Sequence, residues 1–134
     1  MTTATLAAAP TRGRLWTGRI LGALTGLFLA LDSLAKLLEL DPAVKGSAQL
    51  GFAASATIPI GILLAACLAV YLVPRTAILG AVLLTGYLGG AVAIHVRAGN
   101  GAFPVAFTLG TGALVWIAIA LREPGLVRWL GARP

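Results

Sequence analysis

The sequence predicts an all-α fold: a transmembrane four-helix bundle with a short interfacial helix in the first outer loop. The first observation is the absence of charge in three long stretches, from Lys45 to Arg75, from Arg75 to Arg97 and from Arg97 to Arg122. Each stretch is about as long as the ~20 residues that a helix needs to cross a bilayer. The second is composition, because 59% of the 134 residues are hydrophobic and only 10% are charged. A soluble protein of this size would need a hydrated face on almost every helix.

The first predicted span comprises residues 15–38 and follows a mobile cytoplasmic tail over residues 1–14. Its uncharged run, from Ile20 to Leu31, is shorter than a bilayer crossing requires. The span therefore includes charged residues at its end. We interpret it as an uncleaved span, because it lacks a clear small-residue cleavage site and is followed by three further spans.

The first outer loop contains Asp41-Pro42, a typical helix start, and Gly51, a typical helix end. These signals predict the short interfacial helix. The apolar runs after it predict three further spans, at residues 54–73, 77–96 and 103–121. Residues 15–130 then form one membrane domain, and residues 131–134 form a tail.

The distribution of basic residues predicts the orientation. Four spans place seven basic residues on one side of the membrane: Arg12, Arg14, Arg19, Arg75, Arg122, Arg128 and Arg133. They place three on the other: Lys36, Lys45 and Arg97. Basic residues favour the cytoplasmic side. We therefore expect a multi-pass protein of the bacterial inner membrane with both termini in the cytoplasm.

The basic residues stand singly at the ends of apolar runs, so the net charge of +6 reflects topology and does not indicate nucleic-acid binding.

The chain has one cysteine, Cys67, one histidine, His95, and one methionine, Met1. One chain therefore cannot supply a conventional metal or haem ligand set. We expect no metal site and no intrinsic cofactor. The lipid bilayer is the expected partner, and a homodimer is a candidate assembly.

The first span carries the most informative polar residues. Asp32 and Lys36 are four residues apart, so their side chains can pair on one helix face. Ionisable residues at membrane depth are costly and usually face the bundle interior. Glycines at positions 18, 22 and 26 predict close helix packing along the same span. We expect a buried pair, either serving function or only fixing the packing of the helices; Glu39 extends the same stripe.

The third span contains a second polar group. His95 lies near its outer end, at a depth similar to that of Asp32, and histidine readily exchanges protons near neutral pH. Gly86, Gly89 and Gly90 are predicted to form a close-packed face away from His95. We therefore expect a cavity in the outer half, with Asp32 and His95 as candidate catalytic, proton-handling groups. The candidate ligand-pocket residues are Thr25, Lys36, Gln49, Leu84, Thr85, Tyr87, Leu88 and Ala91; Leu29 shares this wall, while Gly86 and Gly90 are excluded from it.

Several segments together resemble the DoxX-like family of small four-span bacterial integral membrane proteins. They are Leu31-Asp32-Ser33-Leu34-Ala35-Lys36-Leu37, Gln49-Leu50-Gly51-Phe52, Leu72-Val73-Pro74-Arg75-Thr76-Ala77-Ile78-Leu79-Gly80, and the stretch from Leu84 to Arg97. The resemblance covers about residues 15–130. The chain departs from the family pattern at Ala53, where proline is frequent, and at Lys45, where an acid is common.

The name-giving member of the wider family resembles a subunit of a membrane thiosulfate:quinone oxidoreductase. The resemblance implies a protein that binds a lipophilic small molecule, with a quinone as one candidate, or that supports a membrane redox partner. The alternative is a membrane-embedded enzyme doing acid–base chemistry on a lipophilic substrate, with Asp32 and His95 handling protons. A weaker alternative is a small proton-coupled exporter, because such transporters also place a carboxylate in their first span.

Overall fold

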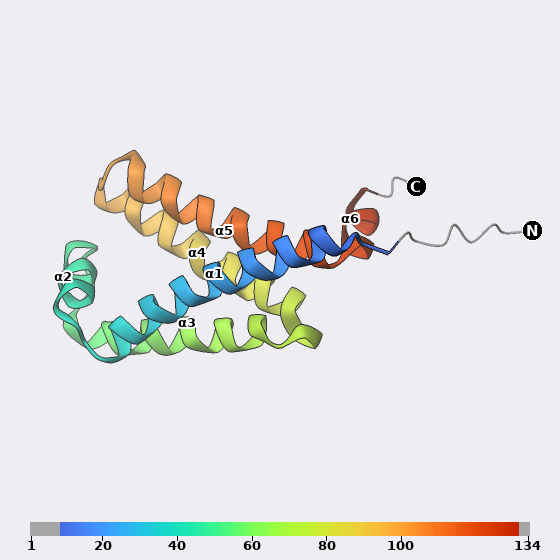
Figure 1. Cartoon of the computed structure of the whole chain (residues 1–134). Helices are drawn as coiled ribbons and strands as arrows, with labels where there is room; N and C mark the ends of the chain where they lie inside the picture. The colour runs from blue at the N-terminus through green and yellow to red at the C-terminus, as the bar shows by residue number, and fades with distance from the viewer. Residues whose placement is uncertain (1–8, 132–134) are drawn as a thin grey trace, which may run out of the picture.

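The computed structural model describes residues 9–131, and the elements within this range are helical (Figure 1). Four long helices are apolar enough to span a membrane: α1 (Arg12–Leu37), α3 (Thr57–Leu72, extended by the 3-10 turn η1, Ala54–Ala56), α4 (Ala77–Ala98) and α5 (Ala102–Arg122). The shorter elements are α2 (Asp41–Gln49), the 3-10 turn η2 (Pro74–Thr76) and α6 (Pro124–Gly131).

The four spans form a ring in which α1 and α4 each pack against both α3 and α5. The chain runs up and down, so neighbouring spans are antiparallel. Helix α2 and the turn between α4 and α5 lie at one end of the bundle, here called the α2 end (Figure 1). Helix α6, η2 and the start of α1 lie at the opposite end, here called the termini end. The predicted fold class, a four-helix bundle with a short helix in the loop between the first two spans, is confirmed.

Most of the apolar surface of the spans faces outwards. In the most apolar 18-residue stretch of each span, only 22% to 33% of the residues are buried inside the protein. Side chains such as Leu24, Ile62, Leu79 and Leu109 remain more than half exposed. A surface of this kind requires a surrounding hydrocarbon phase, so the chain is a multi-pass membrane protein.

The helix ends differ slightly from the predicted spans. Helix α1 begins at Arg12, so the last residues of the predicted tail are helical. Residues 1–8 of that predicted tail lie outside the described residues, as does most of the predicted tail at residues 131–134. Helix α6 was not predicted; it begins with Pro124 and carries the exposed side chains of Trp129 and Leu130.

The termini end of the bundle is packed through glycines. A Cβ on Gly80 of α4 would lie 2.2 Å from the backbone N and Cα of Tyr71 on α3. A Cβ on Gly18 of α1 would lie 2.9 Å from side-chain atoms of Arg122 and Leu121. Gly22 and Gly26 are also buried. The predicted close-packing role of the glycines in the first span is therefore confirmed.

The predicted close-packed glycine face on the third span is wrong. A Cβ on Gly86, Gly89 or Gly90 would meet nothing within 4 Å. All three residues are exposed. The reason is the geometry of the ring: α3 and α4 touch near η2 and separate towards the α2 end, where these glycines lie (Figure 1).

Candidate functional site

The α2-side half of the bundle encloses a cavity of about 430 Å³. Its wall is largely apolar and aromatic, and each of the four spans contributes to it, as do α2 and the residues after it. The lining residues are Phe28, Leu29, Asp32 and Lys36 from α1; Ser47, Leu50 and Phe52 from α2 and the loop; Ile60 and Leu63 from α3; Gly86, Tyr87, Leu88, Gly90, Ala91, Ile94 and His95 from α4; and Phe107, Thr108 and Thr111 from α5.

Asp32 and Lys36 form the only ion pair within residues 9–131, with the Lys36 ammonium donating to the Asp32 carboxylate. The pairing was predicted from their spacing of four residues. The prediction that the pair is buried is wrong for the carboxylate, because the Asp32 side chain is 40% exposed and that of Lys36 is 16% exposed. The cause is the cavity, which leaves Asp32 open on one side.

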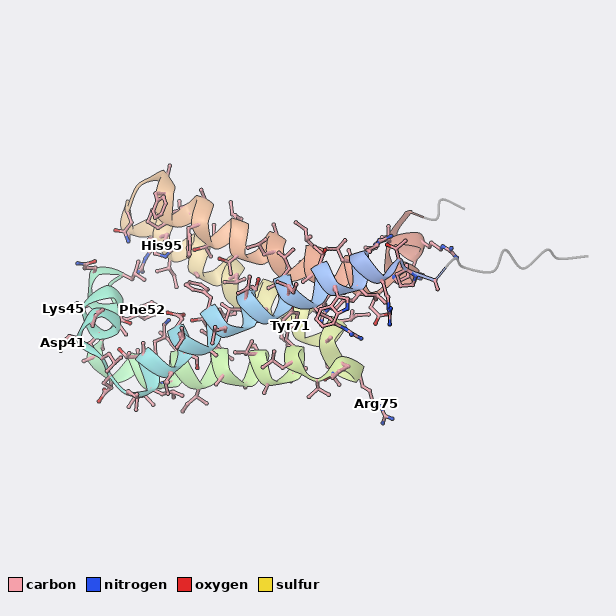
Figure 2. All side chains as sticks on the ribbon, in the orientation of Figure 1. Asp41, Lys45, Phe52, Tyr71, Arg75 and His95 are labelled. Atoms are coloured by element: carbon pink, nitrogen blue, oxygen red, sulfur yellow. The ribbon has the colours of Figure 1, made fainter. Side chains whose placement is uncertain are left out.

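His95 lies on α4 close to the α2 end, as Figure 2 shows. Its Nδ1 atom lies 3.4 Å from the side-chain nitrogen of Asn100, in the turn that follows α4. When the Asn100 amide donates to Nδ1, the ring proton is on Nε2. His95 and Asp32 both line the main cavity, so the structure brings these two predicted groups into one site.

A second, outer pocket of about 490 Å³ lies beside the main cavity at the α2 end. Five residues line both spaces: Asp32, Lys36, Ser47, Leu50 and His95. The outer pocket adds the more polar surroundings of α2 and the α4–α5 turn, including Gln49 and Asn100. The charged pair and the imidazole therefore stand at the boundary between an apolar chamber and a polar mouth.

At the α2 end, one polar contact joins α4 to the end of α2. The Arg97 guanidinium donates a hydrogen bond of 3.2 Å to the carbonyl of Leu50. Gly51 follows in the left-handed region, with φ of 84°. A Cβ there would lie 3.2 Å from Arg97. Glycine at position 51 therefore permits both the helix end and the approach of Arg97.

The structure separates the predicted pocket residues into three groups. Lys36, Tyr87, Leu88 and Ala91 line the main cavity. Gln49 lines only the outer pocket. Thr25 and Leu84 are buried in the bundle and line neither space.

Thr85 is not a pocket residue. Its hydroxyl donates to the carbonyl of Ala81 at 2.7 Å and accepts a hydrogen bond of 2.8 Å from the indole of Trp116 on α5. It therefore joins α4 to α5. Glu39, predicted to extend the polar stripe, is exposed beyond the end of α1 and lines neither space.

Two glycines were wrongly excluded from the cavity wall. Gly86 and Gly90 both line it. Glycine spacing predicts packing residues at these positions, but the separation of α3 and α4 leaves them facing open space.

Other lining residues were missed altogether. Thr108 and Thr111 are three residues apart on one face of α5, and Ser47 and Leu50 share one face at the end of α2. The same helical spacing that identified Asp32 and Lys36 could have identified them.

The arrangement suits an elongated molecule with an apolar body and one polar end. The apolar body would contact Phe28, Leu63 and Phe107, and the polar end would reach the Asp32–Lys36 pair and His95. Concave, mostly apolar spaces with a few converging polar groups are the usual form of small-molecule sites. Within the described residues, no group of three or more His, Cys, Asp or Glu side chains is placed to hold a metal ion.

Comparison with known proteins gives one finding. The model of a family described as the DoxX-like family matches residues 20–118, which covers all four spans in large part. No curated protein and no solved structure matches the chain.

Proposed function

The chain belongs to the DoxX-like family, and on that premise we propose that its main cavity binds a lipophilic small molecule with a polar head. The observation that carries the proposal is the cavity itself: about 430 Å³ within the apolar part of the bundle, with Asp32, Lys36 and His95 gathered at one end. A space of this size is within the range of small-molecule sites.

A quinone fits this chemistry. Its two carbonyl oxygens accept hydrogen bonds, and the Lys36 ammonium and a ring N–H of His95 are donors at the polar end of the cavity. Its ring and tail are apolar and match the aromatic wall around Phe28, Tyr87 and Phe107. Binding of a quinone would also explain a role beside a membrane redox partner, as the family resemblance implies.

Acid–base catalysis on a lipophilic substrate is the second candidate. The observation that favours it is the shared wall: a carboxylate, an ammonium and an imidazole line one chamber. Such groups can exchange protons with a bound substrate. A proton-coupled exporter receives less support, because the five residues that line both spaces all lie towards the α2 end, on α1, the end of α2 and α4, and do not continue across the bundle.

The first test is the identity of molecules that remain bound after purification. Organic extraction and mass spectrometry of the purified protein should recover a compound with an apolar tail and a polar head, in amounts comparable to the protein. Ala91→Phe should lose this compound, because the new ring occupies the cavity. Ala93→Phe, on an exposed position of the same helix, is the matched control and should retain it. Recovery of bulk lipids alone, in equal proportions from each protein, would argue against the proposal.

We also propose that both termini face the cytoplasm of a bacterial inner membrane. Arg12, Arg14, Arg75, Arg122 and Arg128 lie at the ends of helices on the termini side, where Figure 2 labels Arg75. Basic residues favour the cytoplasmic face. In a Cys67→Ala background, Gly99→Cys in the α4–α5 turn should react with an impermeant thiol reagent added outside the cell. Labelling of Gly99→Cys only from the cytoplasmic side would show that the termini face the opposite side and would contradict the proposal.

A further inference from the structure

We propose that the main cavity opens sideways into the bilayer between α3 and α4, through a portal whose α4 edge is formed by Gly86 and Gly90. This inference rests on the proposed binding function and names the source of the ligand: molecules dissolved in the membrane leaflet on the α2 side. The portal is defined by Ile60 and Leu63 of α3 and Gly86 and Gly90 of α4.

The α4 edge of the portal is open because two side chains are missing from it. Gly86 and Gly90 line the cavity and are also exposed on the outer surface of the bundle. A Cβ at either position would meet nothing within 4 Å. An exposed lining residue that has no side chain leaves a gap in the wall between the cavity and the outer surface.

The residues at the α3 edge also line the cavity and reach the outer surface. Leu63 lines the cavity and is 54% exposed. Ile60, one turn earlier, also lines the cavity and is half-buried. These are apolar side chains, so the rim of the portal matches hydrocarbon and not water.

The direction of the glycines follows from helix geometry. Leu88 points towards α5, because a Cβ on Gly112 of α5 would lie 3.6 Å from its Cδ1 atom. Gly90 follows two residues later, a rotation of about 200° on an α-helix. Gly90 therefore faces away from α5, and because it still lines the cavity, it lies at the α3-side edge of the wall that α4 contributes.

The separation of α3 and α4 has a mechanical origin. The two helices are joined by η2 and touch at Gly80 and Tyr71 near that turn. Figure 1 shows them diverging from η2 towards the α2 end. The tight contact at one end and the divergence at the other make the seam wider towards the α2 end, where the cavity lies.

Side-chain hydrogen bonds bridge the α1–α3 seam and the α4–α5 seam. Between α1 and α3, the Ser33 hydroxyl donates to the Gly61 carbonyl at 2.9 Å. Between α4 and α5, the Trp116 indole donates to Thr85 at 2.8 Å. Both contacts cross their seam directly.

At the cavity, the seam between α1 and α5 is bridged by an aromatic contact. The rings of Phe28 and Phe107 meet edge to face, with their centroids 5.4 Å apart. Both residues line the cavity and are partly exposed, at 43% and 49%, but here the two rings occupy the space between the helices. Among the described lining residues, exposed glycines are therefore found only at the α3–α4 seam.

The competing route is the outer pocket, which reaches the cavity from the aqueous side past α2. That route is polar and passes the Asp32–Lys36 pair. An apolar molecule would have to leave the bilayer and enter water to use it, which costs free energy in proportion to its apolar area. The lateral portal avoids that cost and leaves the polar end of the cavity for the head of the ligand.

The test places a single thiol inside the cavity and measures how fast a bilayer-dissolved reagent reaches it. Ala91→Cys in a Cys67→Ala background supplies the thiol, because Ala91 lines the cavity. The protein is reconstituted in liposomes, and labelling by N-(1-pyrenyl)maleimide is followed by pyrene fluorescence. Complete labelling after denaturation shows that the thiol is free.

Three further substitutions distinguish the routes. Gly86→Leu with Gly90→Leu fills the portal. Gly89→Leu adds the same side chain to an exposed position between them that does not line the cavity. Gly46→Leu adds it to the wall of the outer pocket, where a Cβ also meets open space.

The portal predicts that the Gly86→Leu, Gly90→Leu pair slows labelling by about tenfold or more, the effect of ~1.4 kcal/mol added to the entry barrier. Gly89→Leu and Gly46→Leu should label at the original rate. Slowing by Gly46→Leu without slowing by the portal pair would assign entry to the aqueous mouth and overturn the proposal. A thiol that the reagent cannot reach in the folded protein would overturn it as well. The assay needs no natural ligand, so a fast, portal-dependent reaction together with an empty organic extract would reject the binding function alone.

Discussion

Gly80→Ala should destabilise the bundle more than any other glycine-to-alanine substitution in the described part of the chain. The new methyl group would lie 2.2 Å from the backbone of Tyr71, far inside van der Waals contact. Backbone atoms cannot move aside as the end of a side chain can, so α3 and α4 must separate. Overpacking usually costs about 1–3 kcal/mol, and we expect a value at or above the upper end of that range.

The measurement is thermal unfolding in detergent, with a graded set of controls. Gly22→Ala should have a small effect, because its Cβ would be 3.5 Å from the nearest atom, an ordinary contact. Gly89→Ala should be neutral or slightly stabilising, since its Cβ meets open space and alanine favours the helix. A melting temperature for Gly80→Ala equal to that of Gly89→Ala would show that α3 and α4 do not touch at Tyr71.

The fold was predictable because it depends on the bilayer. Uncharged stretches of span length separate the basic residues Lys45, Arg75, Arg97 and Arg122, and few structures other than transmembrane helices accommodate them. The interfacial helix was predictable from Asp41-Pro42 and Gly51, which are local signals. Pairing of Asp32 with Lys36 followed from helical spacing alone.

The site was less predictable because it depends on how the helices separate. The same small residue is a close contact at Gly80 and an opening at Gly90, and the local sequence does not distinguish the two. Thr85 could equally have lined a cavity; only the position of Trp116 on α5 shows that it joins two helices. Helix α6 was missed because Glu123-Pro124-Gly125 resembles a helix end, although proline is also favoured at the start of a helix.

Removing either candidate proton-handling group should weaken ligand binding strongly. Asp32 holds Lys36 in place through the ion pair, and His95 offers the other polar contact at that end of the cavity. A hydrogen bond to a charged group contributes ~1.5–3 kcal/mol, so Asp32→Asn or His95→Ala should weaken the affinity by about tenfold or more. Glu39→Gln is the matched control, because Glu39 lies outside both spaces and should bind as the unchanged protein does.

The most direct measurement of the central claim, that the cavity is a ligand site, is a titration with decylubiquinone in lipid nanodiscs. Trp116 packs against the bundle core and reports binding through fluorescence quenching, in a Trp16→Phe, Trp129→Phe background. In the unchanged protein and in Glu39→Gln, we expect decylubiquinone to quench Trp116 saturably. In Asp32→Asn and His95→Ala, half-maximal quenching should require about tenfold more quinone or beyond. Quenching that never saturates and is identical in all four proteins would mean that the quinone only partitions into the lipid, and would contradict the claim.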